Sequence, residues 1–367
     1  MPMPTLRSTL MTTLLLTAAC GQPPAVARLD VSLKTPKKPG EAYSLVRAAS
    51  ADDQITSIAV SDNYLFFATS WKGVYRLPKY GGAIDPVEED ADAIASVAAS
   101  RDTVFWNRTT FGGGDIAHTQ LKKRAAAGGA SSVLLDGEFS LPGANLNASL
   151  SVVSDALYFT RQSTGGTAPI EFARLSLPGG GLTTLLSVPY PLVDPDALPR
   201  AWVVQGDHFY YTLRGAGGTK LLEAKPDGSG ATQLAAGASL LGTYLGADAD
   251  TLYTDGKVGA YEGLVAVAKA DGALTPLIKG GAASPTAFTS TLGVDKENVY
   301  YMTVDSAAGW QVQAVPKAGG TPTVIGLGSQ FDLGIDQMAQ DDNNLYLLHN
   351  WHEILLLPKK PGDPKGL

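Results

Sequence analysis

The sequence offers few side chains that could do chemistry, and its four histidines are the first to consider. Two of them stand three positions apart in His349-Asn350-Trp351-His352. On a helix this spacing would put both imidazoles on one face, where they could ligate zinc. Here the segment is predicted to join two strands of a hairpin, which does not bring the rings together. We therefore interpret them as loop histidines and predict neither a metal site nor a cofactor.

Clusters of acidic residues raise the second chemical question. Asp248-Ala249-Asp250 and Asp341-Asp342-Asn343-Asn344 carry the oxygen ligands that calcium prefers. Similar acidic or Asn-containing segments recur along the chain, so turn formation explains them better than calcium does. The sequence contains no GxGxxG, P-loop or GxSxG motif, and no catalytic residue is predicted.

Aromatic and basic residues gather in the segments predicted to join the second and third strands of each repeat. Aromatic side chains and arginine are enriched at binding hot spots, and flat rings suit sugar stacking. We predict a binding surface there; the alternative is that these side chains only cap the ends of the strands. The residues are Trp71, Lys72, Arg108, Phe111, Arg161, Arg214, Lys257, Tyr261, Trp310, His349, Trp351 and His352.

Residues 1–19 are typical of an export signal, with Arg7 ahead of a short apolar stretch. The stretch ends in Thr17-Ala18-Ala19-Cys20, which resembles the bacterial lipobox although Thr17 replaces the usual leucine. That resemblance implies a diacylglycerol thioether on Cys20, anchorage in a membrane of the cell envelope, and an outer rather than inner membrane because Gly21 follows. An ordinary signal peptide with an incidental cysteine is the alternative.

Three further segments follow the signal. Residues 20–40 are rich in proline and are predicted to form an extended tether. Residues 43–360 are predicted to form one domain, and 361–367 a short tail. The net charge of −7 argues against a nucleic-acid partner. The short basic runs Lys122-Lys123-Arg124 and Lys359-Lys360 are interpreted as solvated turn charges.

A repeat organises the domain. Seven short apolar strands, each preceded by a polar turn and followed by a third strand and a glycine turn, recur at intervals of 39 to 53 residues. Four antiparallel strands per 40–50 residues predict an all-β propeller with seven blades. The strands are centred on Phe66, Phe105, Tyr158, Tyr210, Tyr253, Tyr300 and Tyr346.

The seventh unit lacks a fourth strand, and an unmatched strand stands at the other end of the domain. Tyr43-Ser44-Leu45-Val46-Arg47-Ala48 is similar to the fourth strands of other units. We predict that it completes the last blade and closes the ring, which removes two open sheet edges.

The repeats resemble those of YWTD-type and TolB-type propellers of bacterial lipoproteins and cell-surface proteins. Leu252-Tyr253-Thr254-Asp255 carries the resemblance best, with Phe105-Trp106-Asn107 and Tyr158-Phe159-Thr160 looser matches. Rings of these types commonly have six blades, so six is the alternative to seven. We expect a monomeric, non-catalytic envelope propeller that binds a protein or glycan. The alternative is a lyase or glycan hydrolase acting at the axial pocket, since propellers host both.

Overall fold

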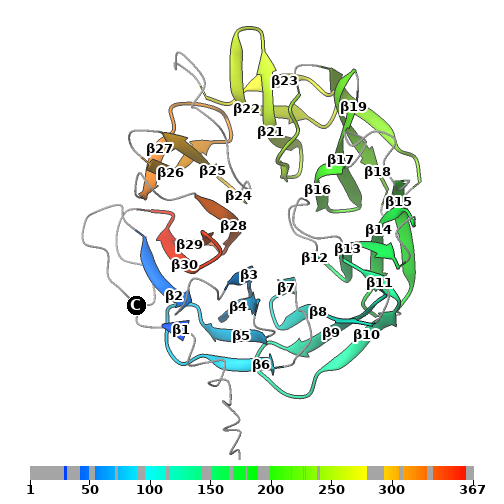
Figure 1. Ribbon diagram of the computed structural model, residues 1–367. Helices are drawn as coiled ribbons and strands as arrows, with labels where there is room; N and C mark the ends of the chain where they lie inside the picture. The colour runs from blue at the N-terminus through cyan, green and yellow to red at the C-terminus, as the bar shows by residue number, and fades with distance from the viewer. Residues whose placement is uncertain are drawn as a thin grey trace, which may run out of the picture.

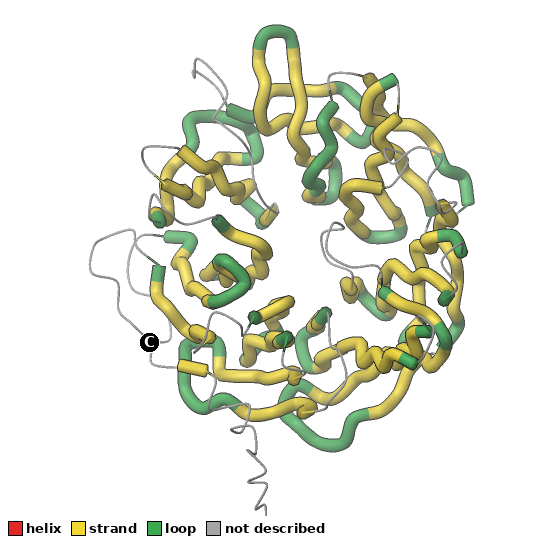
Figure 2. The backbone as a smooth tube through the Cα atoms, in the orientation of Figure 1, coloured by secondary structure: helices red, strands yellow, loops and turns green. Residues whose placement is uncertain are grey.

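Antiparallel strands make up nearly all of the regular structure in the computed structural model (Figure 1). The described residues are 29–30, 42–48, 54–70, 73–89, 96–112, 116–141, 150–164, 168–178, 180–188, 199–215, 217–225, 227, 229–237, 240–278, 293–305, 309–328 and 334–360. Over these residues the chain forms a ring of seven antiparallel blades with no helix, which confirms the predicted fold class and the count of seven (Figures 1 and 2).

In each blade the first strand named below lies next to the axis and the last lies at the outer rim. Blade 1 consists of β3 (Ile55–Val60), β4 (Tyr64–Thr69), β5 (Gly73–Pro78) and β6 (Asp85–Glu89). Blade 2 consists of β7 (Val97–Ala99), β8 (Thr103–Phe111), β9 (Ala117–Ala125) and β10 (Ser132–Gly137). Blade 3 consists of β12 (Leu150–Val153), β13 (Ala156–Ser163), β14 (Ile170–Ser176) and β15 (Leu182–Val188), and β11 (Phe139–Ser140) pairs with the far end of β13.

The remaining blades follow the same plan. Blade 4 consists of β16 (Pro199–Gln205), β17 (His208–Gly215), β18 (Gly218–Ala224) and β19 (Thr232–Gly237), and blade 5 of β20 (Gly246–Ala247), β21 (Thr251–Val258), β22 (Tyr261–Ala268) and β23 (Leu274–Pro276). Blade 6 consists of β24 (Gly293–Val294), β25 (Asn298–Asp305), β26 (Gly309–Pro316) and β27 (Thr323–Leu327). Blade 7 consists of β28 (Ile335–Gln340), β29 (Asn344–His349), β30 (Glu353–Pro358) and β2 (Tyr43–Ala48).

The core is divided among the junctions between blades. Successive side chains of a strand point to opposite faces of its sheet. In β4, Leu65 and Phe67 pack toward blade 7, whereas Phe66 and Ala68 pack toward blade 2. All four are fully buried, so both faces of the sheet are covered. The described residues form seven such apolar clusters, one at each junction.

The ring closes as predicted, because β2 pairs antiparallel with β30 as the outer strand of blade 7. Leu45 and Val46 of β2 are fully buried in the cluster between blades 7 and 1. A short strand that the sequence pattern did not suggest, β1 (Leu29–Asp30), pairs with β2 on its outer side (Figure 1). It lies within residues 20–40, which the sequence predicts to form an extended tether.

Side chains also join neighbouring inner strands near the axis. The Gln337 amide accepts from the backbone N–H of Ile58 at 2.8 Å and donates to the Ile58 carbonyl at 3.1 Å, which links blade 7 to blade 1. The Val97 N–H donates to the Ser57 hydroxyl at 3.2 Å, linking blade 1 to blade 2. Gln340 donates to the Val294 carbonyl at 2.7 Å, linking blade 7 to blade 6.

Bulges interrupt the outer strands. In six blades the register between third and fourth strands shifts by one residue. The extra residue is apolar and lies in or against a core cluster, as Leu45 and Leu185 illustrate. A bulge of this kind breaks the ladder that an edge strand presents and bends it.

Candidate functional site

The two ends of the ring are built differently. At one end the second strand of each blade turns into the third, and the chain passes from one blade to the next; we call this the hairpin face. At the other end lie the first-to-second and third-to-fourth turns; we call this the turn face. Of the residues predicted to form a binding surface, those that the structure describes lie in strands and turns that end at the hairpin face.

Trp351 occupies an unusual turn on the hairpin face. It joins β29 to β30 together with Asn350, and the His352 N–H donates to the His349 carbonyl at 3.0 Å. Both central residues have positive φ, 52° for Asn350 and 55° for Trp351. Turns of this geometry favour Asn followed by Gly, since a bulky residue there is strained by about 1–2 kcal/mol. The Trp351 side chain is nevertheless 40% exposed, so burial does not compensate fully for the strain.

Three blade segments fix this turn. The Trp351 N–H donates to the Asp336 carboxylate at 2.7 Å, and its carbonyl accepts from the Ile55 N–H of blade 1 at 2.7 Å. The Ala48 N–H at the end of β2 donates to the His352 carbonyl at 2.8 Å. Burial raises the pKa of Asp336, although the Trp351 N–H opposes that rise. The result is an exposed indole on a backbone that is held in place from three sides.

Other apolar side chains are exposed on the same face. Strands β8 and β9 have nine residues each against six in β4 and β5, so their hairpin extends about 10 Å further. Phe111 is 71% and Ile116 43% exposed at its tip, where the Gly112 N–H donates to the Ile116 carbonyl. Leu241, in the connection between blades 4 and 5, is 39% exposed.

Not every predicted residue reaches the surface. Trp310 is 2% exposed, because its ring packs 5.6 Å from the His349 ring and over Gly328 between blades 6 and 7. His349 is also buried and lies 3.7 Å from Glu353. These two residues therefore belong to the blade junction and add no exposed side chain to the predicted binding surface. Trp71 and Lys72 lie outside the described residues.

The basic residues on this face are mostly engaged in local pairs. Arg161 bonds Glu171 at 2.7 Å across its hairpin, and Lys257 bonds Glu262 at 2.7 Å. Arg214 is exposed at the end of β17, and Arg108 is half-buried on β8. The Tyr261 hydroxyl donates to the Leu264 carbonyl at 2.8 Å, and burial raises its pKa. The hairpin face therefore gathers exposed apolar tips rather than a cluster of free cations.

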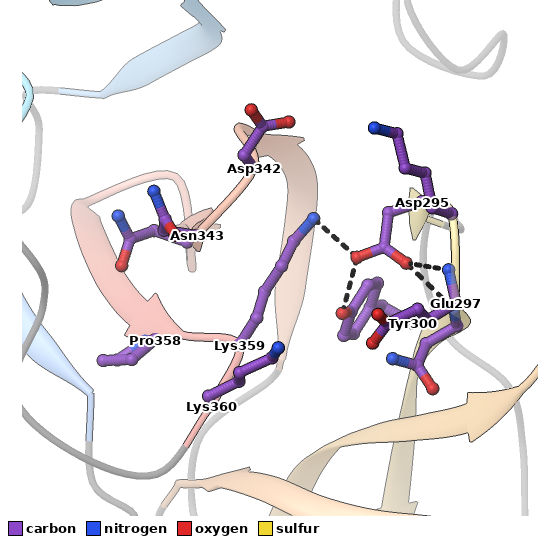
Figure 3. A pocket seen from close by; sticks show the side chains of 11 residues that line it. Asp295, Glu297, Tyr300, Asp342, Asn343, Pro358, Lys359 and Lys360 are labelled. Atoms are coloured by element: carbon purple, nitrogen blue, oxygen red, sulfur yellow. Dashed lines mark hydrogen bonds and ion pairs between the residues drawn. The ribbon is translucent and has the colours of Figure 1, made fainter.

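A polar constellation that the sequence analysis missed lies on the turn face (Figure 3). One carboxylate oxygen of Asp295 accepts from the backbone N–H groups of Glu297 and Asn298, both at 2.9 Å. The other accepts from the Tyr300 hydroxyl at 2.8 Å and from Lys359 Nζ of blade 7 at 3.0 Å. The Lys359 side chain is 4% exposed and lies over the Tyr300 ring. We call this arrangement the Asp–Tyr–Lys latch.

The latch recurs at two neighbouring junctions. In each case an aspartate of one blade binds the tyrosine five residues later and a lysine that follows Pro at the end of the third strand of the next blade. The sets are Asp248, Tyr253 and Lys317; Asp295, Tyr300 and Lys359; and Asp341, Tyr346 and Lys79. Lys359 is thus not the solvated turn charge that the sequence suggested. Nor is Lys122, which bonds Glu88 at 2.6 Å.

The latch between blades 6 and 7 lines a pocket of about 440 Å³ (Figure 3). Burial opposes the charge on Asp295, but the N–H groups of Asn298 and Glu297, the Tyr300 hydroxyl and Lys359 lower its pKa to about 2. Burial and Asp295 raise the pKa of Tyr300. Neither group titrates near neutral pH, so the pair is unsuited to general acid–base work. Its geometry fits a structural role.

The described residues contain no group of three or more His, Cys, Asp or Glu placed to hold a metal ion. The aspartates considered for calcium instead bind their own turns, tyrosines and lysines. Within the described ranges no helix is long and apolar enough to cross a membrane.

Comparison with known proteins extends to the fold. No family model matches the sequence, and no curated protein matches it. Similar solved structures include the β-propeller domain of the trilobed protease from Pyrococcus furiosus, with 10% identity over 85% of this chain and 95% of that chain and a TM-score of 0.56. That domain has an open velcro topology, whereas β2 closes this ring.

Two further solved structures also match. BamB from Moraxella catarrhalis is 14% identical over 87% of this chain and 90% of that chain, with a TM-score of 0.49. TolB from Acinetobacter baumannii is 12% identical over 79% of this chain and 60% of that chain, with a TM-score of 0.38. At these identities the likeness concerns the fold and decides nothing about binding or catalysis.

Asp295→Asn should weaken the latch at neutral pH and matter little in acid. The lowered pKa stabilises the fold above about pH 4, and this contribution is lost as the pH falls through about 2. Allowing for solvent screening, we expect a loss of about 1–2 kcal/mol in the free energy of unfolding at pH 7, shrinking toward pH 2.5. Urea denaturation at both pH values measures it. Asp62→Asn, in an exposed turn, is the control; an equal, pH-independent loss in both variants would contradict the assignment.

Trp351→Gly should not destabilise the protein. Glycine adopts a φ of 55° without strain and keeps both backbone hydrogen bonds, so relief of strain offsets the loss of partial indole burial. We expect the free energy of unfolding to stay within about 1 kcal/mol of the parent value. Chemical denaturation measures it against Asn350→Gly, which changes the same turn and keeps the indole. A loss of several kcal/mol would show that Trp351 is a core residue.

Proposed function

We propose that this chain is a non-catalytic binding or scaffolding propeller, held at the cell envelope by a lipid on Cys20, whose hairpin face binds its partner. The observation that carries the proposal is Trp351. A large aromatic side chain occupies a strained position that glycine would fill more easily, and three neighbouring segments hold it there. Strain that persists at an exposed residue points to function rather than stability.

The surroundings of Trp351 support a binding role. Preorganised aromatic side chains lose little conformational entropy on binding, which is why they dominate binding hot spots. Phe111 and Ile116 supply further apolar contact area on the same face. In contrast, the latch aspartates, whose pKa values are lowered, are already occupied by turn N–H groups and lysines.

Trp351→Gly combined with Phe111→Ser should abolish recovery of a specific partner from detergent-solubilised envelope. The change removes aromatic contacts while the ring stays folded, so capture should fall at least about tenfold. Affinity purification with quantitative mass spectrometry measures the effect. Asn350→Gly combined with Val324→Ser is the matched control, since it alters the same turn and an exposed residue of an outer strand. Equal capture by both double variants would contradict a binding role for the hairpin face.

Cys20→Ser should release the protein from the membrane fraction. Cys20 is the only cysteine, so no other thiol can carry the acyl glycerol. Without the lipid, only contacts of the folded domain can hold the protein at the membrane, and these are insufficient for stable attachment. Labelled fatty acid incorporation and membrane sedimentation in the native host measure the effect. Unchanged labelling in Cys20→Ser would exclude lipidation at this residue.

A further inference from the structure

We propose that the hairpin face lies against the lipid bilayer, with Phe111 and Ile116 of the β8–β9 hairpin and Trp351 in its interfacial layer. The inference rests on the proposed anchor at Cys20 and names the surface that the hairpin face meets. It starts from β1, the short strand added to the outer side of blade 7.

The direction of β1 shows from which face the chain reaches the ring. Strand β2 runs toward the hairpin face and ends at Ala48, whose N–H donates to His352 in the Trp351 turn. Leu29 pairs with Ala48 and Asp30 with Arg47, so β1 runs antiparallel to β2 and away from that face. The chain therefore enters β1 at the hairpin-face end of blade 7.

The length of chain between Cys20 and β1 limits how far the ring can stand from an anchor. Leu29 lies nine positions after Cys20, and nine fully extended Cα–Cα steps span about 30 Å. Without β1 the span would run to Tyr43, at more than twice the residue count. A lipid at Cys20 thus keeps the hairpin face, where the chain enters, close to the bilayer surface.

The side chains on that face fit the bilayer interface. Phe111 is 71%, Ile116 43%, Trp351 40% and Leu241 39% exposed, and they come from different parts of the ring. Tryptophan and phenylalanine favour the interfacial layer of membranes, where each buried apolar surface adds to attachment. The nearby Arg161–Glu171 and Lys257–Glu262 pairs limit the cost of bringing charge to that layer. Several apolar contacts around one face orient a ring more firmly than a single tip could.

The sole cysteine makes a direct test feasible. Once its sulfur carries the lipid, a cysteine introduced by Ile116→Cys is the only free thiol and takes an environment-sensitive fluorophore. Asp62→Cys, on the turn face, is the matched control. Both proteins are reconstituted in vesicles of phosphatidylethanolamine and phosphatidylglycerol, with and without lipids that carry a quencher in the acyl chain. We expect about twofold or greater quenching and a blue shift at position 116, and neither at position 62.

A second arm separates the orientation from the anchor. The chain from Gly21 onward with an N-terminal histidine tag, held on nickel-chelating lipid, should show the same contrast between positions 116 and 62. Inserting twenty Gly/Ser residues before Leu29 should reduce the quenching, because the effective concentration of the face at the surface falls with tether length. Equal quenching at both positions, or quenching at 62 alone, would overturn the orientation.

The outcomes also distinguish this inference from the proposed function. If mass spectrometry finds Cys20 unmodified in the native host, the anchor is refuted and with it the orientation. If Cys20 is lipidated but position 116 stays in water in both arms, the orientation is overturned, whereas the capture experiment with Trp351→Gly still decides whether the hairpin face binds a partner.

Discussion

Every blade is a sheet whose two faces are both apolar, and this constraint governs the whole molecule. Phe66 and Phe67 are consecutive, fully buried, and packed into different junctions, so neither neighbour of blade 1 can be removed without exposing a large aromatic side chain. Each junction is shared by two sheets, and the ring satisfies all of them only when it closes. The pairing of β2 with β30 is therefore part of the core rather than an appendage.

Polar interactions reinforce three consecutive junctions, two of which flank the closing blade. Latches join blades 5 to 6, 6 to 7 and 7 to 1, and the Gln337 and Gln340 amides link blade 7 to its neighbours near the axis. Blade 7 is the only blade assembled from both ends of the described chain, so it has the least help from chain connectivity. Its junctions combine apolar burial with partly buried ion pairs between an aspartate of one blade and a lysine of the next.

The architecture could be predicted from the sequence because each blade is formed by one short, repeated stretch of the chain. Aromatic second strands, aspartate turns and an unmatched strand at Tyr43–Ala48 are all visible in short windows, and they predict the blades and their closure. The latches were missed because Asp341 and Lys79 lie 262 residues apart. Their signal, aspartate five residues before tyrosine and Pro-Lys after the third strand, is legible only once the blade order is known.

The candidate surface was predicted only in part. Position in a hairpin segment identified Phe111 and Trp351, which are exposed, but did not separate them from Trp310, which faces the neighbouring sheet. The face of the strand on which a side chain lies decides whether it is buried or exposed, and an error of one residue in the register reverses that assignment. Nor could residue types show that Trp351 adopts a positive φ, since glycine or asparagine is the usual occupant there.

The interrupted outer strands bear on how copies of this protein coexist when crowded. Two flat sheet edges that meet can pair through backbone hydrogen bonds into one continuous sheet, which leads to irreversible aggregation. Here Leu45, Leu185 and their counterparts turn inward, and the hydrogen-bonding groups beside them fall out of step with any straight strand offered from outside. Densely packed rings could touch rim to rim and still come apart.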